Sequence, residues 1–221
     1  MKRLTVLGYT KRFTPIFILV LSLVVLSCKE TKKEGSSKDL SAAELLGNPE
    51  YSAISYGGYR TNSREVQPTI TQIKADLQIL HAMGVRIVRT YNLQFEHSPN
   101  VVKAIAELRK EDPNFEMYVM LGTWIDCKDA WTEKPDHSQE SLANNSSEIE
   151  KAIALTNEYP EIIKIIAVGN EAMVHWAWSY QVAPAVILKW VNHLQQLKAD
   201  KKLPQELWIT SSDNFASWGG G

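Results

Sequence analysis

Short apolar runs alternate with longer amphipathic segments over most of the chain. The apolar runs predict five strands, at residues 53–59, 85–90, 115–121, 162–168 and 207–212. Apolar residues at helical spacing predict helices at residues 69–83, 101–110 and 184–198, with a further helix that begins near Ser147. Because the strands are apolar throughout and alternate with helices, the pattern indicates an α/β fold with a parallel sheet covered on both faces.

Individual residues refine this prediction. Gly84 follows the first helix at the position where a left-handed backbone conformation commonly ends a helix. Ser147 and Glu150 have the spacing of a capping box for the helix near residue 147. Trp190 falls on the apolar face of the last helix and Trp208 starts the last strand, so both are expected in the core.

Two architectures fit this alternation. A five-stranded doubly wound sheet agrees with the number of strands, whereas a (β/α)8 barrel needs about 250 residues. The residues that follow the strands favour the barrel. The order of the strands would separate the two, because barrel strands lie side by side in chain order and a doubly wound sheet has an order such as 2-1-3-4-5.

The first 27 residues have the features of a secretion signal. A basic start precedes an apolar run at residues 16–26, which is shorter than the roughly 20 residues that span a bilayer. The run ends in VLSC, which resembles the lipobox of bacterial lipoproteins and implies lipidation of Cys28. Residues 28–48 are then the lipidated Cys and a flexible tether, and residues 49–221 the folded domain. We therefore expect an exported protein anchored in the cell envelope, with the outer membrane or cell surface favoured.

Composition and motifs argue against several classes of function. The net charge of −1 and the lack of a basic stripe are not those of a nucleic-acid-binding protein. The five His residues show no HExxH or short His-x-His spacing, so no metal site is expected. A P-loop, a dinucleotide fingerprint and a GxSxG elbow are also missing from the sequence, and no cofactor is expected.

Polar and aromatic residues follow the predicted strands. In both architectures ligands meet the carboxyl ends of parallel strands. Aromatic rings pack on the C–H faces of sugars, and amides and carboxylates pair with sugar hydroxyls, so this mixture suits a carbohydrate. The candidates for sugar contact are Tyr56, Tyr91, Trp124, Asn170, Glu171, Trp176, Asp213 and Asn214.

The run AVGNEAM, which contains Glu171, carries a family resemblance. With ISYGGYR, DLQILHAMGVRIVRTYN, MLGTW and SSDNFASW, it makes the chain similar to glycoside hydrolase family 17, the β-1,3-glucanase-like family of retaining (β/α)8 enzymes. The resemblance implies that Glu171 is the acid/base and that Asn170 binds the 2-hydroxyl of the sugar. It also implies that Tyr56, Tyr91 and Asp213 line the same subsite. An acid/base carboxyl protonates the departing sugar oxygen and then accepts a proton from water.

The same resemblance places the catalytic nucleophile on a Glu at the end of a seventh strand. The chain stops just after the fifth predicted strand, so we expect a truncated barrel that lacks the nucleophile and has uncertain activity. Hydrolysis of β-glucan, or transfer of its glucosyl groups, is the expected activity of the complete enzyme. A non-catalytic, lipid-anchored glucan-binding protein and an unrelated doubly wound domain are the alternatives.

Overall fold

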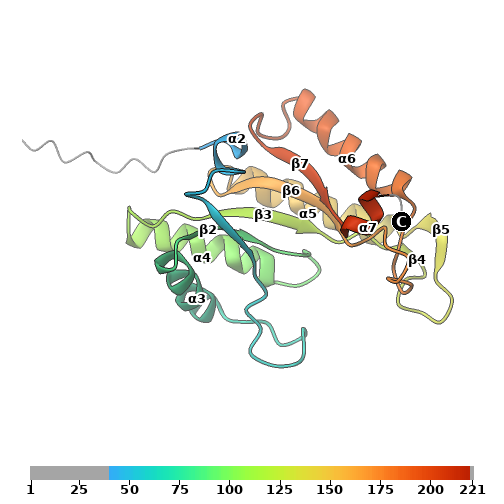
Figure 1. The fold of residues 1–221 in the computed structure, drawn as a ribbon, viewed down its shortest axis with the longest axis horizontal. Coiled ribbons are helices and arrows are strands. Elements are labelled where there is room, and N and C mark those ends of the chain that lie inside the picture. Colours follow the sequence, from blue (N-terminus) through green and yellow to red (C-terminus); the bar gives the residue numbers. More distant parts are fainter. Residues whose placement is uncertain (1–39, 220–221) are drawn as a thin grey trace, which may run out of the picture. The chain divides into compact units, whose positions relative to one another are not determined.

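The computed structural model describes residues 40–219, which form a mixed α/β unit (Figure 1). Its strands are β1 (Ser52–Ser55), β2 (Val85–Arg89), β3 (Tyr118–Thr123), β4 (Cys127–Lys128), β5 (Asp136–Glu140), β6 (Ile163–Asn170) and β7 (Trp208–Ser212). Its helices are α2 (Ala42–Leu45), α3 (Ile70–Ala82), α4 (His97–Glu111), α5 (Leu142–Glu158), α6 (Pro184–Ala199) and α7 (Phe215–Gly219). The predicted signal and the lipidation site at Cys28 lie outside the described residues and stay predictions. None of the helices within residues 40–219 combines the length and apolar character needed to cross a bilayer.

Five strands form one parallel sheet in the order β1-β2-β3-β6-β7. This is the order in which the strands occur along the chain, and it differs from the doubly wound order 2-1-3-4-5. Right-handed connections between strands in chain order place every connecting helix on the same face of the sheet. Figure 1 shows α3 and α4 side by side next to β2 and β3, and α6 alongside β7. The fold is therefore compatible with part of a (β/α)8 barrel.

Two apolar clusters cover the two faces of this sheet. The larger packs the helices onto the sheet through side chains such as Leu77, Ile105 and Ile187 against Val88 and Val168. The smaller joins Leu45 of α2 to Ile87 and Tyr118 on the other face. Helix α2 thus closes the second face near the amino ends of the strands. The carboxyl ends of the strands are left for the functional site.

Most predicted elements are confirmed, but some of their bounds and surroundings differ from the prediction. The helix expected near Ser147 begins at Leu142, and Ser147 and Glu150 lie inside it rather than in a capping box. The polar segment before it contains the antiparallel β4–β5 hairpin. Trp208 is 43% exposed because β7 is an edge strand, whereas Trp190 is buried as expected.

Candidate functional site

A pocket of about 500 Å³ opens where β1, β2, β3 and β6 end. Its lining combines polar and aromatic residues. The lining residues are Gly57, Tyr59, Arg64, Tyr91, Asn92, Trp124, Trp131, Asn170, Glu171 and Tyr180. Tyr91, Trp124, Asn170 and Glu171, four of the eight residues singled out in the sequence, therefore meet in one place.

A bulge at Gly169 turns Asn170 and Glu171 toward the pocket. The register of β6 against β7 shifts between Val168 and Asn170, which makes Gly169 the extra residue of the bulge. Gly169 has φ +79° and Glu171 has φ +47°, both in the left-handed region. The Glu171 N–H donates to the Ser212 carbonyl at 2.9 Å and holds the turn. The glycine in AVGNE is therefore needed for the backbone that presents Glu171.

Replacing Gly169 with alanine should destabilise the protein by about 2 kcal/mol. A left-handed backbone costs a residue with a Cβ roughly 1–2 kcal/mol, and the new Cβ would lie 2.9 Å from Ile187 Cδ1 and 3.2 Å from Ala172 Cβ. Gly47→Ala is a matched control, because Gly47 has φ +78° and a Cβ added there would have no neighbour within 4 Å. Urea unfolding of both variants measures the difference, and equal losses would contradict this account of the bulge.

Arg89 of β2 fixes the orientation of the Asn170 carboxamide. Its Nη2 donates to Asn170 Oδ1 at 2.6 Å, and its guanidinium lies 5.1 Å from the centre of the Tyr91 ring. Burial lowers the pKa of Arg89, and electrostatic interactions with Tyr91 and Glu171 raise it in part. Because Arg89 holds the amide oxygen, the direction of the NH2 group, the donor of Asn170, is set as well. This role of Arg89 depends on a contact between two strands that the sequence does not reveal.

Buried Glu148 of α5 ties together the loops after β2 and β3. Its carboxylate accepts the Leu93 N–H at 2.9 and 3.1 Å and the Trp124 N–H at 3.0 Å. Burial raises its pKa, and these backbone hydrogen bonds lower it in part. Asn92, next to Leu93, lines the pocket, and its buried Oδ1 has no hydrogen-bond partner among residues 40–219. A ligand hydroxyl is the kind of group that satisfies such an atom.

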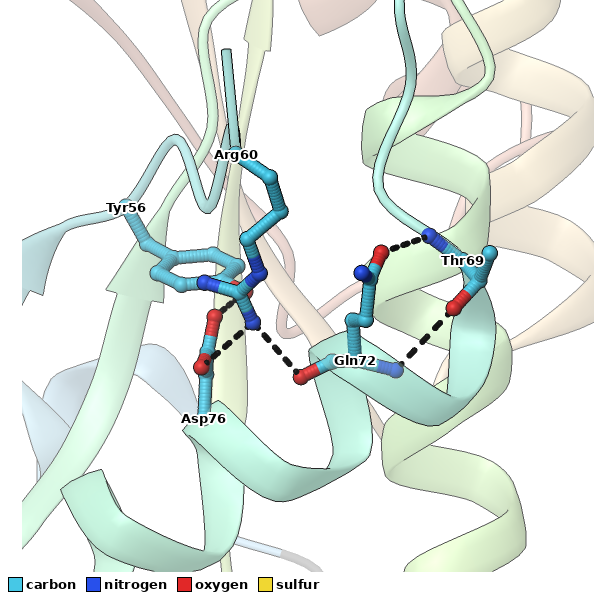
Figure 2. Close-up of polar contacts among 5 residues, drawn as sticks. All are labelled: Tyr56, Arg60, Thr69, Gln72 and Asp76. Carbon is cyan, nitrogen blue, oxygen red and sulfur yellow. Dashed lines mark hydrogen bonds and ion pairs between the residues drawn. The ribbon is translucent and has the colours of Figure 1, made fainter.

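Tyr56 does not line the pocket, contrary to the sequence-based prediction. Figure 2 shows its ring turned toward α3, where its hydroxyl donates to Asp76 Oδ2 at 2.7 Å. Burial and this hydrogen bond raise the pKa of Tyr56. Arg60 Nη2 reaches Asp76 Oδ1 at 2.8 Å and the Gln72 carbonyl at 3.2 Å, while Thr69 and Gln72 cap the same helix. The predicted strand 53–59 ends at Ser55, so Tyr56 lies in a loop that these bonds fasten to α3.

Three other predicted residues also lie outside the pocket lining. Asp213 Oδ2 accepts the Met173 N–H at 2.8 Å, so it supports the loop that follows Glu171. Asn214 Oδ1 accepts the Ala216 N–H at 3.1 Å at the start of α7. Trp176 is exposed on the loop after β6. Asp213 and Asn214 thus hold backbone at the carboxyl end of the sheet.

Several pocket residues were not chosen from the sequence. Arg64 and Tyr180 lie in connecting loops away from any strand end, and no local pattern distinguishes them. Three others, Tyr59, Asn92 and Trp131, stand near predicted strand ends or in the loop after β3. The directions of their side chains depend on the loop conformation. Within residues 40–219 there is no group of three or more His, Cys, Asp or Glu side chains arranged to hold a metal ion.

The chain is similar to the crystal structure of an endo-laminarinase from Formosa Hel1_33_131. The TM-score is 0.80 and the sequence identity 63%, over 82% of this chain and 46% of that enzyme. The chain thus spans less than half the length of the laminarinase. No family model matches the chain, and no curated protein matches it. The similarity is consistent with a glycoside hydrolase.

Proposed function

We propose that this chain contributes the acid/base half of a retaining glycosidase site that cleaves β-1,3-linked glucan. The observation that carries the proposal is the presentation of Glu171 beside Asn170 in a pocket of a chain 63% identical to an endo-laminarinase. The resemblance to glycoside hydrolase family 17 assigns Glu171 the same role. A parallel sheet in chain order supports a (β/α)8 barrel as the complete fold.

The proposed chemistry uses Glu171 twice. Its carboxyl first donates a proton to the glycosidic oxygen as the bond to the departing sugar breaks, and its carboxylate then takes a proton from the attacking water. Asn170, held by Arg89, donates from its NH2 group to a hydroxyl of the sugar at the cleavage point. Aromatic residues of the pocket pack on the C–H face of a glucosyl ring.

A retaining mechanism also requires a nucleophilic carboxylate about 5–5.5 Å from the acid/base. Glu171 is the only carboxylate that lines the pocket in the part of the chain that the structure describes. In this proposal the nucleophile comes from the seventh strand of a complete barrel. That strand is not β7, which is the fifth strand of the parallel sheet. Binding of glucan without cleavage is the second candidate function of the 221-residue chain by itself, and the single pocket carboxylate is what favours it.

A chimeric enzyme tests the proposal. Residues 40–219 replace the segment of the Formosa laminarinase that they match, and the release of reducing ends is measured on laminarin and on a β-1,4-linked glucan. We expect the chimera to cleave laminarin and to leave the β-1,4-linked glucan intact. The laminarinase is the positive control. A folded chimera that leaves laminarin intact would rule out the proposed activity.

A further inference from the structure

Three aromatic rings form one wall of the pocket. The ring centres of Trp124 and Tyr180 are 4.9 Å apart, and those of Trp131 and Tyr180 are 5.0 Å apart. Trp131 stacks on Tyr180 with an angle of 24° between the ring planes. All three side chains line the same pocket as Glu171. We call Trp124, Trp131 and Tyr180 the aromatic wall.

A buried carboxylate holds one of the two indoles of this wall. Asp126 is only 3% exposed, and its Oδ1 accepts the Trp124 indole N–H at 2.5 Å. Burial raises the pKa of the Asp126 carboxyl, and the hydrogen bond from the Trp124 indole lowers it in part. Asp126 therefore fixes the direction of the Trp124 ring, whose centre lies 6.1 Å from that of Trp131.

The backbone around Asp126 is also tightly held. Asn145 of α5 pairs with the Asp126 backbone in both directions, accepting its N–H at 2.9 Å and donating to its carbonyl at 3.0 Å. The Cys127 N–H donates to the Tyr180 carbonyl at 3.1 Å. The loop after β3 is thereby joined to the loop that carries the third ring, so the wall behaves as one unit.

Folding alone does not account for this arrangement. Trp131 is 61% exposed and has φ +65°, a conformation that side chains with a Cβ adopt at an energetic cost. The backbone N–H of Trp131 donates to the Ser179 carbonyl at 2.8 Å. A buried carboxylate is also costly to desolvate, and apolar packing is commonly no less stable. A strained, largely exposed indole that stacks on Tyr180, beside a second indole held by a buried acid, indicates a surface kept ready for a ligand.

We propose that the aromatic wall is a binding subsite for a glucosyl ring next to Glu171, and that Asp126 is the positioning residue that keeps it assembled. This inference rests on the proposed function and adds the residues that bind the sugar. Pyranose rings with equatorial substituents have broad apolar faces, and stacked indole and phenol rings match them. The ligand class is therefore a β-linked gluco-oligosaccharide bound through ring faces.

Binding to the full 221-residue chain tests this proposal without requiring turnover. Laminarihexaose is titrated by calorimetry and by intrinsic Trp fluorescence into the unsubstituted protein and into Asp126→Ala, Asp126→Asn and Trp131→Ala. We expect Kd to rise about 3- to 10-fold in Asp126→Ala and Trp131→Ala, the range that one aromatic contact supplies. Asp126→Asn keeps one acceptor oxygen, so it should lie between Asp126→Ala and the unsubstituted protein.

A double-substitution cycle separates positioning from general stability. If Asp126 acts by holding Trp124, Asp126→Ala combined with Trp124→Ala should bind little worse than Trp124→Ala alone. Fully additive losses would overturn the positioning role. Asp129→Asn is the matched control, because its exposed carboxylate lies in the same loop, and its Kd should not change. Trp131 is mostly exposed and can be truncated without opening a core cavity, so it keeps the test valid if Asp126 variants do not fold.

The outcomes distinguish this inference from the proposed function. No binding of laminarihexaose by the folded, unsubstituted protein would count against both. Binding by the unsubstituted protein with the same Kd in Trp131→Ala would overturn the subsite alone. Weaker binding in Trp131→Ala, with unchanged binding in Asp126→Ala, would keep the subsite and remove the role of Asp126.

Discussion

Glu171→Gln should lower kcat/KM on laminarin by about 10²–10⁴-fold in the chimeric enzyme. This is the range that general acid–base catalysis supplies, and an amide of the same shape cannot donate the proton that the departing sugar oxygen needs. The substitution keeps the N–H of residue 171 and therefore its hydrogen bond to the Ser212 carbonyl. We expect laminarihexaose to bind with a similar Kd, because the aromatic wall and Asn170 are unchanged.

The nature of the leaving group provides a sharper test. Dinitrophenolate departs from a dinitrophenyl β-glucoside without protonation, so the rate of cleavage of this glycosidic bond should fall much less than that of laminarin. Glu206→Gln is the control for a change of charge, because Glu206 is exposed near the amino ends of the strands. Equal losses on both substrates, or no loss on laminarin, would contradict the assignment of Glu171 as acid/base.

Local patterns were sufficient for most of the fold. The apolar periodicity of α3 and α6 placed these helices to within one residue, and Gly84 has the expected left-handed conformation with φ +89°. The start of α5 was missed because its first turns contain buried polar side chains. Asn145 and Glu148 point inward to hold neighbouring loops, so their polarity resembled that of a surface loop. Tertiary hydrogen bonding thus outweighed the local pattern.

The rule that ligands meet strand ends placed half of the predicted residues in the pocket. It succeeded for Asn170 and Glu171, which lie directly on the strand and its bulge. It was wrong for Tyr56, because the chain leaves the sheet after Ser55 and the ring follows the loop toward Asp76. It could not find Tyr180, which reaches the pocket through backbone pairing between two loops. A strand end gives a residue's position, but the direction of its side chain depends on contacts distant in sequence.

Acidification should destabilise the protein through His97, which lies behind the pocket-lining Tyr59. The His97 ring is 4% exposed and stacks on Tyr59 with a centre-to-centre distance of 5.3 Å. Its Nε2 has no hydrogen-bond partner among residues 40–219. Burial lowers the pKa of His97 from 6.5 to about 4. The folded protein therefore resists protonation of this ring in a pH range in which the unfolded chain accepts the proton.

The sign and size of the effect follow from this difference in pKa. Between pH 6.5 and pH 4 the unfolded chain binds one more proton at His97 than the folded protein, so the free energy of unfolding falls as the pH falls. The total loss is about 3 kcal/mol, reached near pH 4, below which both states bind the proton. Burial raises the pKa of Asp126 and of Glu148, and these carboxyls change stability in the opposite direction.

Comparison with His97→Gln isolates the contribution of the imidazole. Glutamine does not titrate, while Asp126 and Glu148 are present in both proteins and their contributions cancel. Urea unfolding at pH 7 and near pH 4 should show that the unsubstituted protein loses about 2–3 kcal/mol more than His97→Gln on acidification. If both proteins lose the same amount, His97 is protonated in the folded state, and its ring does not hold Tyr59 as a neutral stacking partner.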